Sequence, residues 1–439
     1  MSKYISIYKK IKSDILNNII KPNEKLESKR VLSEKLQVSI NTVIQAYNLL
    51  LDEGLIISIP KKGYFVIDHK ININNTYKKV ENEDITYKYD FSTKNIDDDA
   101  FPYFTWCKIS KNIIYNDKKI ISKSSGKGLF ELRESISKHL YEAKGIYANP
   151  NNIIIGSGIE YLLSIITFLI PAKKYGVENP GYDKVEKILL NNNKNVKYIN
   201  LDSEGVVIDE LNDIEAIYIT PENQFPTGIK TSINRRLKLA SWAQNKKYII
   251  EDDYDSAFKY LSSSYLSLYS LVKDNTIYLS TFSRSITPGL RISYMILPDS
   301  LLSIYEDKFK YYSSTVSTID QLILNEFISG GYYNRHLNKT KNLYKQKRNK
   351  IIEILEQFDF ISIDYKNSLL SLIISIPDFD KQKFKILCKE NKIDINILDD
   401  YYFTDLKSNK IIIGYSGINI NHIDDGINLL IEIIKRVKF

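Results

Sequence analysis

The sequence predicts an α/β protein in two parts: an N-terminal winged helix-turn-helix, then a larger domain with a mainly parallel sheet and a small α+β C-terminal part. Three helical patterns followed by two short strands in residues 1–67 predict the first part. The second is predicted because short apolar runs alternate with longer helical patterns. A length of 439 residues favours two or three domains. We therefore predict domains over 1–67 and 89–439, with a polar linker over 68–88.

The elements of residues 1–67 follow from spacing and capping residues. Apolar side chains recur at helical spacing over 4–15, which predicts a first helix. A second helix begins after Ser28, its N-cap, and a third from Asn41. Two strands, 55–59 and 64–66, are joined by a turn that contains two lysines.

Positive charge is concentrated in this first part. Residues 1–67 hold eleven lysines and arginines against six acidic residues, in a chain of net charge +8, which suggests an anionic partner there. In a helix-turn-helix that binds DNA, side chains in the first turn of the third helix reach phosphates and base edges. Cations of the second helix and the wing contact the sugar-phosphate backbone of the DNA. The alternative is a surface three-helix unit with ordinary charges. The expected contacts to double-stranded DNA are Ser28, Arg30, Ser39, Asn41, Thr42, Gln45, Lys61 and Lys62.

Composition excludes several other classes. The two cysteines, Cys107 and Cys388, lie far apart and the four histidines are scattered, so neither a metal site nor a disulfide framework is expected. Residues 1–12 lack the continuous apolar core of a signal peptide, and the longest apolar stretch, 161–171, is too short to span a bilayer. We expect a cytoplasmic protein that does not contact a membrane.

In the larger domain, small and acidic residues follow the predicted strands. Apolar runs at 153–155, 216–219, 248–250 and 277–279 are each followed by such residues, and a further run covers 292–297. Open α/β sheets bind ligands at the carboxyl ends of their strands. A long helix through 335–354 and an α+β tail ending in a helix over 424–437 complete the domain.

Several of these residues could hold a phosphorylated aromatic cofactor. The turn at 156–160 directs backbone amides toward a phosphate, and Arg291 could clamp that phosphate. Asp252 could pair with a pyridinium nitrogen, Tyr254 could bind a ring oxygen, and Tyr182 could stack on the ring. Each also has an ordinary alternative: a structural connection, a solvated carboxylate or a core tyrosine.

Residues 1–67 resemble the winged domain of GntR-type regulators, and the motifs that carry this resemblance are 26–30, 38–43, 53–55 and 63–66. Ile40 departs from the pattern, which usually has arginine there. The rest of the chain resembles the aminotransferase-like domain of fold-type I pyridoxal phosphate enzymes, through the motifs at 101–106, 128–133, 220–228, 251–255, 281–285 and 288–291. The combination is similar to MocR-type regulators, which fuse these two domains.

The resemblance implies roles for the candidate residues. The turn of Gly158, with the amides of Ile159 and Glu160, would bind phosphate together with Thr281, Ser283 and Arg291. Tyr182 would cover the ring, and Asp252 and Tyr254 would hold its nitrogen and phenolic oxygen. Related regulators form homodimers, so a dimer is expected.

One position departs from the family's chemistry. Arg284 stands where the family has its Schiff-base lysine, and a guanidinium stays protonated and cannot attack an aldehyde. The arginine that binds substrate carboxylates is replaced by Ile412. We therefore predict no catalytic residues: a regulator that binds pyridoxal phosphate or a relative non-covalently as effector, with Arg284 as an additional anion contact. The alternatives are a pyridoxal phosphate-dependent aminotransferase with an attached DNA-binding module, a regulator whose pocket senses a different compound, and a scaffold without a small ligand.

Overall fold

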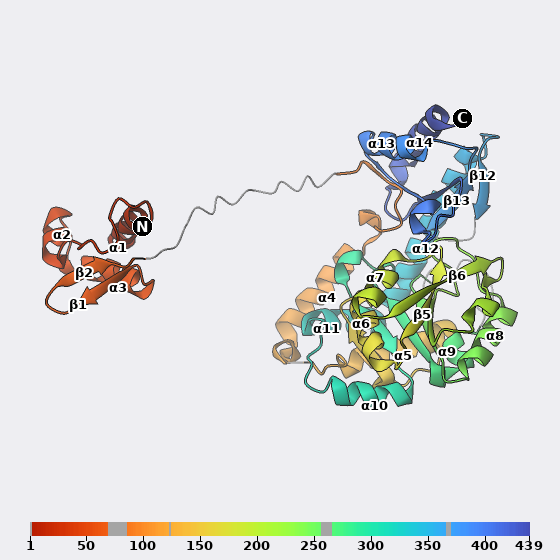
Figure 1. Cartoon of the computed structure of the whole chain (residues 1–439), viewed down its shortest axis with the longest axis horizontal. Helices are drawn as coiled ribbons and strands as arrows, with labels where there is room; N and C mark the ends of the chain where they lie inside the picture. Colours follow the sequence, from red (N-terminus) through yellow and green to blue (C-terminus); the bar gives the residue numbers. More distant parts are fainter. Residues whose placement is uncertain (1, 69–85, 123, 256–265, 366–369) are drawn as a thin grey trace. The chain divides into compact units, whose positions relative to one another are not determined.

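The computed structural model describes residues 2–68, 86–122, 124–255, 266–365 and 370–439. Contacts between residues divide the chain into two units, Met1–Asp84 and Ile85–Phe439 (Figure 1). The linker expected over 68–88 falls mainly outside the described residues. Its last residue belongs to the larger unit, because the Lys88 amide donates a hydrogen bond to the Lys392 carbonyl at 2.9 Å.

The smaller unit contains every element expected for residues 1–67. Its helices are α1 (Lys3–Leu16), α2 (Lys29–Lys35) and α3 (Ile40–Asp52), and its strands β1 (Ile56–Ile59) and β2 (Gly63–Val66) pair antiparallel. Helix α3 buries Val43, Ala46, Tyr47 and Leu50 against the other elements. The spacing of these apolar residues places them on one face of the helix and leaves the opposite face exposed.

The larger unit is built on a mixed, mainly parallel sheet with the strand order β4-β11-β10-β9-β8-β5-β6-β7. The adjacent strands β6, β5, β8, β9 and β10 run parallel to one another, whereas β11 is antiparallel to both β10 and β4. The strands are β4 (Ile153–Gly156), β5 (Lys174–Asn179), β6 (Asn195–Asp202), β7 (Gly205–Val206), β8 (Ala216–Ile219), β9 (Tyr248–Asp253), β10 (Thr276–Thr281) and β11 (Ser293–Ile296).

Helices cover both faces of this sheet (Figure 1). Successive side chains of a strand point to opposite faces of the sheet and so pack in different hydrophobic cores. In β4, Ile153 and Ile155 pack with α4, α5 and α11, whereas Ile154 packs with α6 and α10. A further core joins the sheet to α8 and α9. The bounds are α4 (Tyr103–Asn116), α5 (Phe130–Lys144), α6 (Ile159–Leu169), α7 (Asp183–Asn191), α8 (Ile233–Ala243), α9 (Leu268–Leu271), α10 (Asp299–Lys308) and α11 (Thr318–Ser329).

The C-terminal part is a small α+β subdomain, as predicted. The expected long helix is α12 (Tyr332–Leu355), which begins after Gly331 in the left-handed region, at φ +69°. Strands β12 (Ser362–Tyr365), β13 (Ser371–Ser375), β16 (Lys410–Gly414) and β15 (Asn396–Ile397) form an antiparallel sheet in that order, flanked by α13 (Lys381–Glu390) and α14 (Ile423–Val437). Strand β14 (Ile393–Asp394) pairs with β3 (Tyr89–Asp90).

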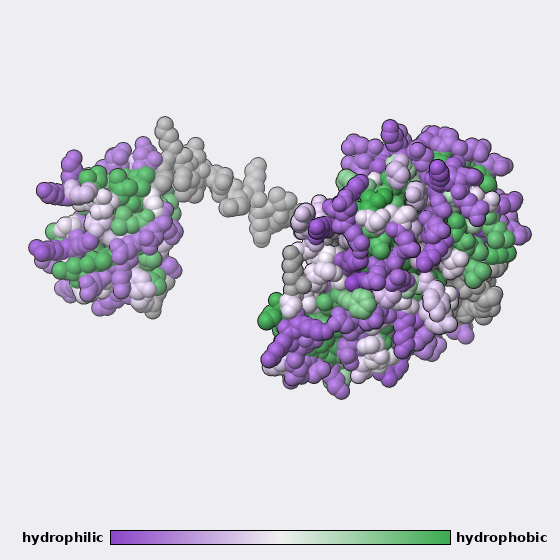
Figure 2. Space-filling model, turned by 90° about the horizontal axis from the view of Figure 1, so that it is seen from below, coloured by the Kyte–Doolittle hydropathy of each residue, from purple (hydrophilic) through white to green (hydrophobic). Residues whose placement is uncertain are grey.

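The surface is mixed in character. On the faces shown in Figure 2, hydrophobic areas lie among hydrophilic ones on each unit. None of the described helices has the length and apolarity to cross a membrane. Over the same residues, histidine, cysteine and carboxylate side chains form no group of three or more that could hold a metal ion.

Candidate functional site

A cavity of about 540 Å³ lies where the parallel strands end. Strands β4, β8, β9 and β10 run in one direction, so the residues that follow them gather at one edge of the sheet. The structure thus brings together ten residues from sequence-distant segments, and their role in binding stays a prediction. All ten residues expected to hold a cofactor line this cavity: Gly158, Ile159, Glu160, Tyr182, Asp252, Tyr254, Thr281, Ser283, Arg284 and Arg291.

The turn between β4 and α6 can receive an anion. Gly158 has φ +99°, a conformation that L side chains rarely adopt, so this turn favours glycine; a Cβ atom there would also lie 2.6 Å from Nη2 of Arg291. Ile159 and Glu160 are the first residues of α6, and their N–H groups therefore have no carbonyl partner within the helix. Free amides at a helix N-terminus form an anion site.

Hydroxyl groups after β10 complete this end of the cavity. The Ser283 amide donates to Oγ1 of Thr281 at 3.1 Å, and Oγ of Ser293 lies 2.9 Å from the same oxygen. These contacts fix the turn that carries Thr281 and Ser283 against the neighbouring strand β11.

Glu160 is held between two cations that line the cavity. Its carboxylate oxygens lie 3.0 Å from Nζ of Lys184 and 3.0 Å from Nη2 of Arg291. Burial acts to raise the pKa of Glu160, but hydrogen bonds and these two cations lower it more, so the net pKa is below its ordinary value. Arg291, expected to clamp a phosphate, therefore already carries an ion pair, and a phosphate would have to share it.

Asp252, which lines the cavity, has one unsatisfied acceptor oxygen. Its side chain is buried at the end of β9, and its Oδ2 accepts a hydrogen bond from the Tyr218 hydroxyl. The other oxygen, Oδ1, is buried and finds no donor among the described residues. Burial raises the pKa of Asp252 to about 7. A ligand with a ring N–H would supply the missing donor, so the residues present fit a pyridine-type group.

Aromatic side chains wall the cavity beside Asp252. Tyr182 meets Phe225 edge to face, with ring centroids 5.8 Å apart, and Phe225 meets Tyr254 in the same manner at 6.0 Å. The Tyr254 hydroxyl accepts a hydrogen bond from Nδ2 of Asn223 at 3.1 Å. This arrangement offers a flat, partly apolar slot of the kind that an aromatic ring fills.

Arg284 adds a cation to the cavity. It follows Ser283 at the end of the cavity and is half-buried. Within the described part of the chain, no hydrogen bond or ion pair engages its guanidinium. Because this group always carries its proton, position 284 holds a permanent positive charge and no nucleophile.

Ile412, which is predicted to stand in place of a carboxylate-binding arginine, lies in an apolar cluster. Ile412 is 1% exposed on β16 and packs with Leu398 and Tyr401. Phe225 packs against the same cluster, and both Phe225 and Tyr401 line the cavity. Ile412 itself lies behind this wall, and the cluster contributes the aromatic rings of Phe225 and Tyr401 to the cavity.

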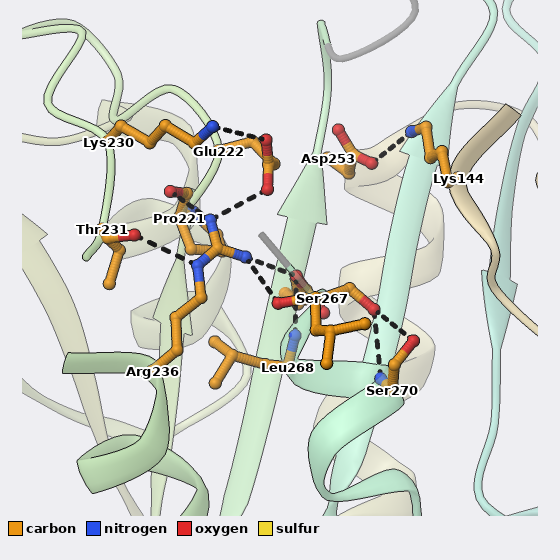
Figure 3. A network of polar contacts seen from close by, with 12 residues as sticks. Lys144, Pro221, Glu222, Lys230, Thr231, Arg236, Asp253, Ser267, Leu268 and Ser270 are labelled. Atoms are coloured by element: carbon orange, nitrogen blue, oxygen red, sulfur yellow. Dashed lines mark hydrogen bonds and ion pairs between the residues drawn. The ribbon is translucent and has the colours of Figure 1, made fainter. Parts of the chain in front are cut away.

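Two buried charged residues hold the loop between β8 and α8. Oε2 of Glu178 accepts hydrogen bonds from the Thr220 amide and hydroxyl, at 3.1 and 2.6 Å, and burial raises its pKa to about 7. Arg236 is fully buried, donates to the Pro221 and Thr231 carbonyls, and lies 2.9 Å from Oε1 of Glu222 (Figure 3). These contacts fix the segment that supplies the aromatic wall.

Several residues that build the cavity were not expected from the sequence. The sequence predicts Tyr218 only as part of a strand, and its hydrogen bond to Asp252 appears only in the structure. Lys94 and Tyr401 reach the cavity from segments far from the strand ends and carry no local signal. Asn223 could have been suspected, because it lies in the 220–228 motif next to a predicted strand end.

The smaller unit presents the expected DNA-contacting residues near its surface. Arg30, Asn41, Gln45, Lys61 and Lys62 are exposed. The remaining three residues have capping contacts: Oγ of Ser28 accepts from the Val31 amide at 3.3 Å, and Oγ of Ser39 accepts from the Thr42 amide at 3.2 Å and lies 2.8 Å from Oγ1 of Thr42. These hydroxyls therefore also fix the starts of α2 and α3.

Two family models match the chain. Residues 3–66 match the bacterial regulatory proteins of the gntR family, and residues 109–404 match aminotransferase class I and II. Among solved structures, an archaeal alanine:glyoxylate aminotransferase aligns with a TM-score of 0.71 and 21% identity over 79% of this chain and 91% of that chain. At this identity the likeness establishes the fold.

Curated relatives match along most of this chain. The uncharacterized HTH-type transcriptional regulator YdeL of Bacillus subtilis (strain 168) is 33% identical over 97% of this chain and 96% of its own length. The probable rhizopine catabolism regulatory protein MocR of Rhizobium meliloti is 23% identical over 97% and 92%. The HTH-type pyridoxine biosynthesis transcriptional regulator PdxR of Corynebacterium glutamicum is 28% identical over 78% and 76%. With a GntR-type winged helix-turn-helix fused to an aminotransferase fold, the chain belongs to the MocR-type transcriptional regulators.

Proposed function

We propose that this regulator binds double-stranded operator DNA through residues 1–67 and senses a small effector in the cavity of the larger domain, residues 89–439. The exposed polar and basic residues of α3 and the wing support the first role. The cavity at the strand ends, with its anion site and unsatisfied acceptor, supports the second. Because it acts on DNA, we place the protein in the cytoplasm.

The proposed effector is pyridoxal phosphate or a close relative, bound without a covalent bond. The first amides of α6, with Thr281 and Ser283, would hold the phosphate, and Tyr182 would cover the ring. Asp252 carries the proposal, because its buried Oδ1 requires a donor such as a ring N–H. The name of PdxR, a regulator of pyridoxine biosynthesis, is consistent with this ligand class.

We further propose that the domain recognises this ligand without turning it over. Pyridoxal phosphate supplies an aldehyde and an electron-accepting ring to enzymes that bind it. In this chain, Arg284 cannot give up a proton, form a bond to the aldehyde or return a proton to a substrate carbon. Ile412 provides no cation for an amino-acid carboxylate. Recognition and regulation are therefore the favoured activity, and an aminotransferase is the alternative.

The functional form that we propose is a homodimer, which would present two winged modules to paired half-sites. Aromatic and aliphatic side chains exposed on and after α4 support it, because a larger apolar surface often marks an interface. These are Tyr103, Phe104, Ile114, Tyr115 and Ile121.

Replacing Lys61 and Lys62 by alanine tests the wing. We expect weaker binding to duplexes of any sequence. The slope of the logarithm of the binding constant against the logarithm of the salt concentration should become shallower by up to about 2, since each phosphate contact contributes about 0.9 to this slope. Fluorescence anisotropy with labelled duplexes at several salt concentrations measures both. The matched control, K383A/K389A, removes the same charge from exposed positions of α13. Equal salt dependence in the wing variant and the wild type would contradict the assignment.

Effector sensing is tested by the DNA affinity of the full chain with and without pyridoxal phosphate. We expect the ligand to change the affinity for promoter DNA that carries paired half-sites, because an effector regulates only by favouring one arrangement of the modules. The variant Asp252→Asn should respond only at much higher ligand concentration. An unchanged affinity at saturating ligand would contradict the proposal.

A further inference from the structure

The cations of the cavity are not equally available to a ligand. Lys184 and Arg291 both contact Glu160, each at 3.0 Å. Lys94 is exposed, so water solvates its charge. Arg284 is half-buried and meets no acceptor in the described ranges of the chain. A guanidinium taken partly out of water and left without an acceptor indicates that a ligand supplies one.

The position of Arg284 fixes which part of the ligand it faces. It comes directly after Ser283, at the anion end of the cavity. Its charge also acts on Asp255, the neighbour of Tyr254: burial raises the pKa of Asp255 to about 7, and Arg284 opposes this rise. Arg284 lines the same cavity as the phosphate-binding turn and Tyr254, which would hold the phenolic oxygen. In the proposed pose, Arg284 faces the ring carbon between the carbon that bears the phosphate group and the carbon that bears the phenolic oxygen.

Arginine and an aldehyde are poorly matched at this contact. An aldehyde offers one uncharged oxygen, whereas the guanidinium presents a planar fork of donors that fits both oxygens of a carboxylate. The cluster that contains Ile412 contributes only Phe225 and Tyr401 to the cavity, so this wall holds no cation for a carboxylate on a longer arm such as that of an amino-acid adduct. A second anionic group would therefore have to be attached close to the ring.

Resting on the proposed function, we propose that the effector is a phosphorylated pyridine carboxylate, with the carboxylate at the ring position where pyridoxal phosphate has its aldehyde. The phosphate binds at the start of α6, the ring N–H faces Asp252, and the carboxylate pairs with Arg284. In this assignment, Arg284 determines specificity for the carboxylate over the aldehyde at that ring position.

Calorimetry on the full chain with three probes tests the proposal. The probes are 4-pyridoxic acid 5′-phosphate, pyridoxine 5′-phosphate and pyridoxal phosphate, which carry a carboxylate, an alcohol and an aldehyde at the same carbon. We expect the carboxylate probe to bind about 10- to 100-fold more tightly than the alcohol, the range of a charge-assisted bidentate contact. In Arg284→Gln this preference should disappear. Because no group among the described residues pairs with Arg284, Arg284→Met serves as a second variant.

The outcomes separate this inference from the proposed function. Equal affinities of the wild type for the carboxylate and the alcohol, or a preference that persists in both Arg284 variants, would overturn the inference. If pyridoxal phosphate and the alcohol bind but the carboxylate does not, the inference fails and the proposed ligand class stands. If none of the three probes binds, both fail.

Discussion

Replacing Arg236 by methionine is expected to lower the free energy of unfolding of the larger unit by about 3–5 kcal/mol, the range for removing one partner of a buried ion pair. Arg236 is fully buried and lies 2.9 Å from Glu222 and 4.0 Å from Glu251. Its loss leaves both carboxylates without this cation, together with the carbonyls that it binds (Figure 3). Ligand affinity should fall as well, because the same contacts hold the loop that bears Phe225.

Tryptophan fluorescence during denaturant unfolding measures this effect. The two tryptophans of the chain, Trp106 and Trp242, both belong to the larger unit, so the signal reports that unit. The control Lys238→Met makes the same kind of change at an exposed position of α8, where a change within about 0.5 kcal/mol is expected. If the Arg236 variant matched this control, Arg236 would have no supporting role.

Replacing Asp252 by asparagine is expected to have opposite effects on stability and on binding. Burial raises the pKa of Asp252 to about 7 in the folded protein, from 3.8. A raised carboxyl pKa contributes stability that is full below about pH 4 and is lost as the pH rises through 7. Asparagine does not titrate, so the ligand-free variant should be more stable than the wild type at pH 8 by about 1–3 kcal/mol, with no such gain at pH 4.

The same substitution removes the charge that favours a protonated ring nitrogen. We expect pyridoxal phosphate to bind at least about 10-fold more weakly to Asp252→Asn at neutral pH, because a charge-assisted hydrogen bond is lost. Thermal unfolding across pH and calorimetry measure the two effects. Asp274→Asn, at an exposed position, should change neither. A variant that is less stable at pH 8 and binds normally would show that Oδ1 of Asp252 does not face the ligand.

Sequence patterns predicted the architecture because its signals are local. Apolar spacing and N-caps such as Ser39 mark the winged module, and apolar runs mark β4, β8, β9, β10 and β11. Strand β5 gave no such signal, since its buried Glu178 and Asn179 look like surface residues. Their partners, Thr220 and Thr404, lie 42 and 225 residues away in the chain. Only the folded structure shows that these polar groups are satisfied.

The candidate site likewise has a part that the sequence predicts and a part that only the folded structure shows. Residues at strand ends, such as Asp252 and Thr281, could be named in advance because topology brings those ends together. The support of Asp252 by Tyr218, the ion pairs of Glu160 and the burial of Arg236 depend on contacts between distant segments. The lack of a partner for Arg284 within the described ranges is likewise a property of the fold, and it gives the substitution its consequence.

The most direct test of a regulator that recognises its ligand without reacting with it is to titrate the full chain with pyridoxal phosphate by calorimetry. The same mixture is then treated with borohydride and its intact mass is measured. We expect heat of binding and an unchanged protein mass, whereas Arg284→Lys, which restores a nucleophile, should gain the mass of one reduced coenzyme. A mass gain in the wild-type chain, or product formed from an amino donor, would contradict the account.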